Sequence, residues 1–333
     1  MKQFHGRNKK SSYFEGWYLK HQSGEDTVCF IPAFHVDERG ERSASLQVIV
    51  NEKTGFMEYP ASRFYASESG FYCHIGNSRF SINGIEVDFE CEGMRVKGKI
   101  EYSQVKPPKK DIMGPFAAVP FMQCCHGILS MSHELKGELD INGRTVNFDG
   151  GRGYIEKDRG TSFPSAYTWL QCSWGERAGH SLMLAVAEIP LPGFAGHPAA
   201  GRLCKDSQIT KSPGTFTGII FSALIGGEEY RIATYKGARI IKNDGNEIWI
   251  RQKDLLLKVR MYETSGQSSK ETAGRGKGGG IALRAPRWGR MSQFIMERPR
   301  CRVRCRLTSN GKPVFDMTSE KASAERRERG NLR

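Results

Sequence analysis

The segment from Gly151 to Gln171 concentrates more side chains suited to acid chemistry than any other stretch of this sequence. It holds a glycine cluster, two carboxylates, a lysine, two tyrosine hydroxyls and a tryptophan. Glycines let the backbone bend where a Cβ would clash. Charged groups beside large aromatic side chains predict a partly desolvated pocket, in which a carboxyl group can keep its proton at neutral pH. The segment therefore predicts a site of proton transfer.

Glu156 is the first candidate for the acid. In a strand, Tyr154 and Glu156 share one face, whereas Lys157 points to the other. A phenol beside a carboxyl group is a plausible proton-donating pair, and burial near Trp169 would raise the pKa of Glu156. The competing interpretation is a salt bridge with Lys157 or with an arginine, which would lower that pKa.

A second aromatic and acidic cluster spans Tyr13–Lys20. In a strand, Glu15 shares a face with Tyr13 and Trp17, so Glu15 is the second candidate acid. The competing interpretation is a buried, hydrogen-bonded glutamate that braces the first strand.

Three tryptophans are candidates for the wall of a pocket: Trp17, Trp169 and Trp174. The face of a tryptophan ring stabilises a nearby cation by up to about 2 kcal/mol when the pair is desolvated. Ordinary core packing is the competing interpretation for each ring. We expect one or two of the three to do both.

In this order along the chain, the motifs resemble those of the tocopherol cyclase family over nearly the whole length. The matching residues are Tyr13–Tyr18, Lys20, Ser130, Met131, His133, Gly153–Lys157, Gly160, Phe163, Pro164, Trp169, Gln171, Ala285, Pro286, Gly289, Met291, Ile295 and Glu297. Arg159 departs from the pattern, because plant members usually carry tryptophan there. This departure bears on the identity of the substrate more than on the fold.

The resemblance implies a fold and a reaction. The family is similar to carotenoid hydratases and other lipocalin-like proteins, built from two β-barrel-like domains. The implied reaction protonates the alkene of a prenylated hydroquinone, and the phenol oxygen then closes a chromanol ring, without a redox cofactor or metal. His126 occupies a place comparable to a histidine of the related hydratases; a structural histidine is the alternative. Tyr18, Lys157 and Gln171 are expected to bind substrate.

The composition favours a globular protein in a reducing compartment. The chain has 333 residues, 38% of them hydrophobic, but no apolar run long enough for a transmembrane helix. The N-terminus does not resemble a secretory signal. Nine cysteines, without zinc-finger spacing, favour reduced thiols over disulfides or a metal site. We expect a cytoplasmic protein without a metal centre.

The net charge of +14 gathers near the C-terminus, where residues 284–333 carry 14 Lys and Arg against 5 Asp and Glu. The arginines of the run Arg300–Arg306 alternate with Cys and Val, which predicts a half-buried strand with a charged outer face. The run lacks aromatic side chains that would stack on bases, which argues against nucleic acid. Peripheral contact with anionic lipid is an alternative that would suit a substrate dissolved in membrane.

Strands must position these residues, because the dominant hydrophobic period is two. Apolar and polar residues alternate around Asn83-Gly84, Asn142-Gly143 and Asp244-Gly245, which predicts three hairpins. Few stretches keep a helical period. We predict an all-β fold of two lipocalin-like antiparallel β-barrel or sandwich domains with few helices. The N-terminal domain is predicted over residues 1–149 and the C-terminal domain over 150–318. A flexible charged tail is predicted over 319–333, and a loop within the second domain over 265–280.

The leading interpretation is a tocopherol cyclase-like enzyme, formally an intramolecular lyase or isomerase, that acts on a prenylated hydroquinone or a related lipophilic molecule. Glu156 and Tyr154 would donate the proton. The alternatives are a non-catalytic lipocalin-like carrier of a lipophilic small molecule and a hydratase of a terpenoid alkene. A cyclase needs a titratable acid inside an apolar cavity, whereas a carrier does not. The oligomeric state is left open.

Overall fold

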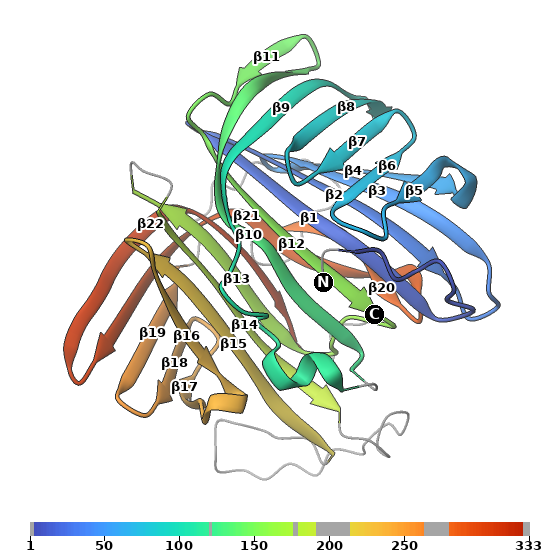
Figure 1. Cartoon of the computed structure of the whole chain (residues 1–333). Coiled ribbons are helices and arrows are strands. Elements are labelled where there is room, and N and C mark those ends of the chain that lie inside the picture. The colour runs from blue at the N-terminus through green and yellow to red at the C-terminus, as the bar shows by residue number, and fades with distance from the viewer. Residues whose placement is uncertain (1–2, 120–121, 176–178, 191–213, 263–279, 329–333) are drawn as a thin grey trace, which may run out of the picture.

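The computed structural model describes residues 3–119, 122–175, 179–190, 214–262 and 280–328. These residues form two antiparallel sheets and three short 3-10 helices, and no α-helix occurs within the described ranges (Figure 1). The predicted all-β class with few helices is confirmed. In this part of the chain, no helix combines the length and the apolar character needed to cross a membrane. The loop predicted over 265–280 lies, apart from Gly280, outside the described residues.

The first sheet has twelve strands and curls into a nearly closed barrel. Its order is β4-β3-β2-β1-β12-β10-β9-β8-β7-β6-β5, with β11 paired to β10, so β12 lies between β1 and β10. The elements are β1 (Tyr13–Ser23), β2 (Asp26–Val36), β3 (Arg42–Val50), β4 (Lys53–Pro60), η1 (Ala61–Arg63), β5 (Phe64–Ala66), β6 (Tyr72–Ile75), β7 (Ser78–Ser81), β8 (Gly84–Cys91), β9 (Met94–Lys106), η2 (Gly114–Ala118), β10 (Cys124–Ile141), β11 (Arg144–Asn147) and β12 (Arg152–Gly160).

The second sheet has ten strands and stays open. Its order is β16-β15-β14-β13-β22-β21-β19-β18-β17, with β20 paired to β21, so β22 lies between β13 and β21. The elements are β13 (Tyr167–Trp174), β14 (His180–Pro190), β15 (Thr215–Ile225), β16 (Glu228–Ala233), η3 (Thr234–Lys236), β17 (Arg239–Asn243), β18 (Glu247–Gln252), β19 (Leu255–Met261), β20 (Ile281–Arg287), β21 (Arg290–Ser309) and β22 (Lys312–Arg327).

All three predicted hairpins are present. Asn142 (φ 54°) and Gly143 (φ 80°) form the two-residue turn between β10 and β11, as expected for a type I′ turn. The β7–β8 and β17–β18 hairpins are the other two. At β7–β8, however, Gly84 lies in the strand rather than in the turn. A Cβ at Gly84 would come within 2.4 Å of the carbonyl oxygen of Ile100 on β9.

The chain passes from one sheet to the other between β12 and β13, after Gly160 and before Tyr167. The domain boundary predicted at residue 150 precedes this point and stays a prediction. The flexible tail is wrong for residues 319–327, which belong to β22. This strand is held by β13 on one edge and β21 on the other, and the small side chains of Ala322 and Ala324 pack in the core. Residues 329–333 lie outside the described residues.

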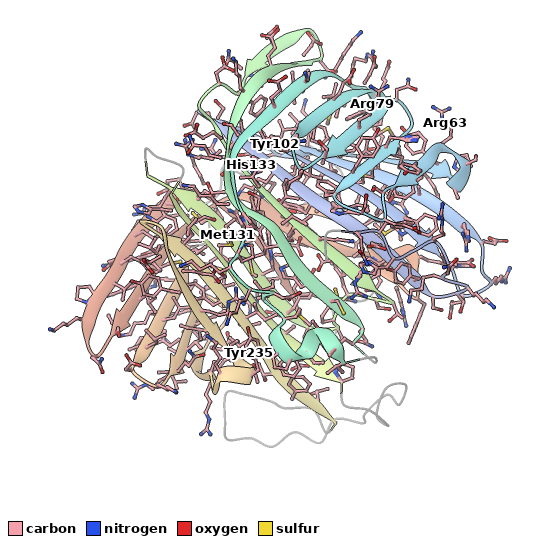
Figure 2. All side chains as sticks on the ribbon, viewed as in Figure 1. Arg63, Arg79, Tyr102, Met131, His133 and Tyr235 are labelled. Carbon is pink, nitrogen blue, oxygen red and sulfur yellow. The ribbon has the colours of Figure 1, made fainter. Side chains whose placement is uncertain are left out.

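Three of the four apolar clusters among the described residues are large, and they hold the molecule together. One fills the barrel of the first sheet and one lines the second sheet. The third joins the sheets, and includes Met131 of β10 and Met183 of β14. Figure 2 shows Met131 at this junction, while Tyr102 and His133 lie farther up, on the barrel strands β9 and β10. The third core surrounds the site described next.

Candidate functional site

A cavity of about 160 Å³ lies between the two sheets. Its walls come from β1–β3, β10 and β12 of the first sheet, from η2, and from β13–β15 and β20–β22 of the second sheet. Most of its lining is apolar, including Phe14, Ile31, Phe163, Trp169, Leu283 and Ile295. Its carboxyl groups are Glu156 and Asp158 from one sheet and Glu325 from the other. An apolar cavity with a few convergent polar groups is the usual form of a small-molecule site.

Strand β12 presents alternate residues to the cavity and to the barrel interior. Tyr154 belongs to the core between the sheets, and Glu156 and Asp158 line the cavity. Ile155, between them, belongs to the barrel core. The predicted shared face of Tyr154 and Glu156 is therefore confirmed, and it follows from the two-residue period of a strand.

Glu156 lies at the centre of a buried hydrogen-bond network and is only 5% exposed. Tyr154 donates its hydroxyl to Oε2 at 2.6 Å, and the indole N–H of Trp169 donates to the same oxygen at 3.1 Å. Burial raises the pKa of Glu156 to about 7, although the charge of His126 and the two hydrogen bonds oppose the shift. A carboxyl group with this pKa carries a proton in a large fraction of molecules at neutral pH and can donate it.

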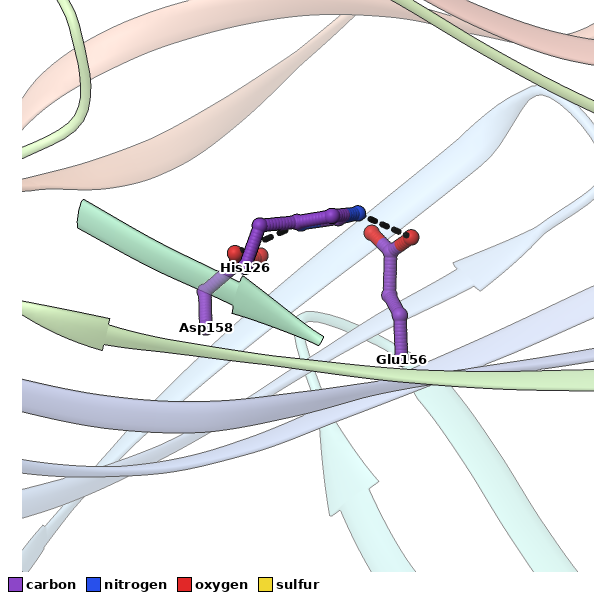
Figure 3. Close-up of side chains that lie close together, drawn as sticks. All are labelled: His126, Glu156 and Asp158. Carbon is purple, nitrogen blue, oxygen red and sulfur yellow. Dashed lines mark hydrogen bonds and ion pairs between the residues drawn. The ribbon is translucent and has the colours of Figure 1, made fainter. Parts of the chain in front are cut away.

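His126 links the two carboxyl groups of β12 (Figure 3). It lies directly opposite Asp158 in the β10–β12 ladder, and Nδ1 is 2.8 Å from Oδ1 of Asp158. Nε2 is 3.4 Å from Oε2 of Glu156 and has no hydrogen-bond partner among the described residues. Burial alone would lower the pKa of His126, but the charges of Asp158 and Glu156 raise it to about 9. The ring is therefore an imidazolium at neutral pH.

His126, Glu156 and Asp158 also form a group that could hold a metal ion, since one ligand atom from each lies within 4.8 Å of the others. The sequence predicted no metal site. Imidazole and carboxylate ligands suit several divalent cations. The two carboxyl groups already have hydrogen-bond partners in Tyr154, Trp169 and His126, so a metal is not needed to satisfy them.

The second sheet contributes two more carboxyl groups that the sequence does not assign to the site: Glu297 is buried and Glu325 is half-buried. Glu325 on β22 accepts a hydrogen bond from Tyr167 at 2.7 Å. Glu297 on β21, its direct ladder partner, accepts one from Tyr18 of the first sheet at 2.6 Å. Burial raises the pKa of each to about 8, helped by the charge of Glu325 on Glu297 and of Glu156 on Glu325. Only Glu325 lines the cavity.

Glu15, the second candidate acid, lies on the barrel side of β1 and does not line the cavity. It accepts hydrogen bonds from the Tyr13 hydroxyl at 2.7 Å and the His5 backbone N–H at 2.8 Å, and it forms an ion pair with Lys157. Burial would raise its pKa, but hydrogen bonds from His5 and Lys157, with the lysine charge, lower it. This environment is that of the competing interpretation, a glutamate that braces the first strand.

Three of the six predicted substrate-binding residues line the cavity. Tyr18 and Trp169 line it and meet edge to face, with ring centroids 5.4 Å apart. Trp17 also borders it, but its ring stacks on Phe71 inside the barrel, 5.4 Å away. Of the three candidate tryptophans, Trp169 belongs to the core between the two sheets.

Three predicted substrate-binding residues lie elsewhere. Lys157 is the ion-pair partner of Glu15. Gln171 accepts a hydrogen bond from Lys20 at 2.9 Å, which joins the two sheets. Trp174 packs against Phe315 in the core of the second sheet. None of the three lines the cavity, so their predicted contact with substrate has no support in this geometry.

Asp158 and Glu325 line the cavity but were not among the predicted site residues, and they differ in whether a sequence pattern marks them. Asp158 stands two positions after Glu156, so the strand period alone places it on the same face. Glu325 follows a stretch with almost no apolar side chains, and its neighbours on β13 are more than 150 positions earlier in the chain. No local pattern marks it as a cavity residue.

The family comparison covers the centre of this site. Residues 86–189 match the model of the Tocopherol cyclase-like family. This segment contains His126, Tyr154, Glu156, Asp158 and Trp169, and the predicted resemblance is confirmed over it. No curated protein matches the chain.

Two solved structures are similar in fold. One is an AttH-like protein from Nitrosomonas europaea, with 9% identity and a TM-score of 0.47, over 97% of this chain and 94% of that one. The other is kievitone hydratase from Nectria haematococca, with 11% identity and a TM-score of 0.48, over 98% of this chain and 93% of that one.

Proposed function

We propose that this chain is a tocopherol cyclase-like enzyme that adds an oxygen nucleophile to the alkene of a prenylated hydroquinone by acid catalysis. The observation that carries the proposal is Glu156, a carboxyl group in an apolar cavity with a pKa raised to about 7. Its hydrogen-bond partners and the imidazolium of His126 hold it in place. The family match over residues 86–189 supports the reaction class.

In the proposed reaction, Glu156 transfers its proton to the less substituted alkene carbon. A tertiary carbocation then develops at the neighbouring carbon. The phenol oxygen attacks this carbon, the new carbon–oxygen bond closes the ring, and the phenolic proton passes to the Glu156 carboxylate. The product is an isomer of the substrate, and the acid is regenerated without a co-reactant. His126, held by Asp158, keeps a positive charge beside the carboxylate that forms and so stabilises it.

The aromatic and apolar lining of the cavity suits a carbocation. Trp169 stands beside the acid, because its indole nitrogen is hydrogen-bonded to Glu156. The faces of aromatic rings attract cations, most strongly when the pair is desolvated. Phe14 and Phe163 line the same cavity and pack against each other with centroids 5.4 Å apart. A water molecule admitted here would compete with the phenol and give a hydration product instead.

The hydratase and carrier interpretations use the same cavity. A hydratase of a terpenoid alkene would need the same acid and a bound water as nucleophile. A carrier would need only the apolar lining, and its affinity would not depend on the ionisation of Glu156. The buried network around Glu156 favours an enzyme, since unpaired or titrating polar groups are costly in a purely apolar binding site.

We also propose a lipophilic small molecule as the partner and the cytoplasm, with peripheral contact to a membrane, as the location. The exposed face of β21 supports the lipid contact, because Arg302, Arg304 and Arg306 are exposed while the residues between them are buried. Arg302 pairs with Glu320 and Arg304 with Asp316, which reduces the free positive charge. Unaltered binding to anionic vesicles after charge reversal of Arg302 and Arg304 would refute this contact.

The test of the enzymatic proposal compares the wild-type protein with Glu156→Gln on a panel of prenylated hydroquinones, with products separated by mass-resolved chromatography. A product of unchanged mass that is absent with the variant supports the cyclase. A product heavier by one water supports the hydratase. Binding without turnover, equal in both proteins, supports the carrier and removes Glu156 from the chemistry.

A further inference from the structure

Among the described residues, Glu325 is the one carboxyl group on the second-sheet wall of the cavity. Its Oε2 accepts the hydroxyl of Tyr167, which lines the same cavity, at 2.7 Å. Its other oxygen, Oε1, accepts no hydrogen bond from any of the described residues. A polar atom that lines an apolar cavity and lacks a partner is costly unless a ligand or water completes it.

The neighbours of Glu325 fix its direction. Trp169 is its ladder partner on β13 and Glu297 its ladder partner on β21, so the three side chains stand side by side on one face of the second sheet. Trp169 donates a hydrogen bond to Glu156 of the first sheet, and Tyr18 of the first sheet donates one to Glu297 of the second. Glu325 lies between these two cross-sheet hydrogen bonds, and its free oxygen is left to the cavity.

The charges around Glu325 favour its neutral form. Burial raises its pKa to about 8, the hydrogen bond from Tyr167 opposes the shift, and the charges of Glu156 and Asp158 add to it. A protonated carboxyl group has one O–H donor and a carbonyl acceptor. A hydroxyl group of a ligand can satisfy both.

We propose that Glu325 and Tyr167 form a second polar subsite of the cavity, which binds a hydroxyl group of the substrate. The two walls then divide the recognition of one molecule. The first sheet, with Glu156 and His126, faces the alkene, and the second sheet, with Glu325, holds a hydroxyl. The chemical class that fits is an amphipathic phenol or alcohol with an alkenyl chain. This inference rests on the proposed function for the role of the first wall only.

The test measures binding, so that it does not depend on turnover. A prenylated hydroquinone and its dimethyl ether are titrated by tryptophan fluorescence into the full chain carrying Glu156→Gln, in which the ligand is not consumed. The added variants are Glu325→Leu, which removes both polar atoms, Glu325→Gln, which keeps a donor and an acceptor, and Tyr167→Phe. Melting temperatures show whether each variant folds.

The subsite predicts that Glu325→Leu weakens the hydroquinone about tenfold, the usual scale for one hydrogen bond, and leaves the ether unchanged. Glu325→Gln restores most of the preference, and Tyr167→Phe loses part of it. Equal weakening of both ligands, an unchanged preference in Glu325→Leu, or no binding of either ligand overturns the subsite. Failure of the enzymatic proposal would look different: absent turnover in the wild-type protein with the hydroxyl preference intact.

Discussion

The indole N–H of Trp169, on the second sheet, donates a hydrogen bond to Oε2 of Glu156, on the first sheet, over 3.1 Å. The candidate acid is therefore oriented from both sheets at once. Tyr154 holds the same oxygen from the first sheet at 2.6 Å. Both donors favour the charged carboxylate and so limit the rise in its pKa. The packing between the sheets thus sets the acidity of the group.

Replacing Trp169 with phenylalanine should raise the pKa of Glu156, because it removes one of the hydrogen bonds that lower it. The alkaline limb of the pH–activity profile should then move to higher pH, and the free energy of unfolding should fall by about 1 kcal/mol. Trp174→Phe is the matched control, since Trp174 lies on the same strand but outside the cavity lining. An unchanged pH–activity profile in Trp169→Phe would show that the hydrogen bond from Trp169 does not influence the pKa of Glu156.

The imidazole of His126 should titrate near pH 9 in the wild-type protein and at a lower pH in Asp158→Asn. Burial lowers the pKa of His126, and the carboxylate 2.8 Å away is the leading influence in the opposite direction. Nitrogen-15 NMR of the histidine side chains would measure both values. Asp88→Asn, in strand β8, serves as control and should leave the titration of His126 unchanged. His35 provides an internal reference in each protein, because burial lowers its pKa to about 4.

The free energy of unfolding should decline as the pH rises from 7 to 8.5. Glu297 and Glu325 have folded pKa values of about 8, above the ordinary 4.5, so the folded state holds more protons than the unfolded state between these values. Stability is therefore lost as the pH rises through the folded pKa. His126, raised from 6.5 to about 9, acts in the same direction.

Glu297→Gln tests this dependence, because the amide can still accept the Tyr18 hydroxyl but cannot ionise. Each such group contributes up to about 1.4 kcal/mol per pH unit, so the slope of stability against pH should become shallower in the variant. Chemical denaturation at pH 7.0 and 8.5 would give the slopes. The buried histidines with lowered pKa, such as His21 at about 4, affect only lower pH. An identical slope in both proteins would show that Glu297 is already ionised.

Gly153→Ala should destabilise the fold by about 1–3 kcal/mol, the usual cost of overpacking. A Cβ at this position would lie 2.0 Å from Nε2 of His133. That ring cannot move freely, because Nδ1 is hydrogen-bonded to Ser130 at 2.9 Å and the ring packs against Tyr102 with centroids 4.2 Å apart. Gly70→Ala is the control, since no atom lies within 4 Å of a Cβ there. Equal thermal stability of the two variants would contradict the close packing.

Chelation followed by dialysis should leave turnover intact if His126, Glu156 and Asp158 act by proton transfer alone. The same three side chains have the geometry to hold a cation, so the experiment distinguishes two uses of one site. Activity that is lost on chelation and returns with one divalent cation would assign them as ligands. Metal analysis of the purified protein provides the independent measurement.

The local part of this site could be predicted from sequence, and the part made by tertiary packing could not. The shared face of Tyr154 and Glu156 follows from a strand period of two, and the Asn142-Gly143 turn follows from the readiness of Asn-Gly to adopt the positive φ angles that the structure shows there. The sequence predicts a flexible tail at Glu325, because the residues after Glu320 have almost no apolar face. Its place depends on β13 and β21, which hold β22 along both edges.

Glu15 shows the converse limit. Its sequence neighbourhood of tyrosine and tryptophan looks much like that of Glu156, yet the two carboxyl groups face opposite sides of one pair of strands. What separates them is the partner each meets: Lys157 for Glu15, and His126 with Trp169 for Glu156. Composition alone does not reveal which carboxyl group receives the cation of a neighbouring lysine.

The position of β22 has a consequence for biosynthesis. This strand is the last that the structure describes, yet it lies in the interior of the second sheet between β13 and β21. During synthesis on the ribosome, β13 therefore lacks its partner β22 until about 150 further residues have been added. Until then, the backbone hydrogen-bonding groups at this edge of β13 are open to other chains. A nascent chain of this protein would need shielding during that interval, and the carboxyl group of Glu325 would be the last to join the cavity.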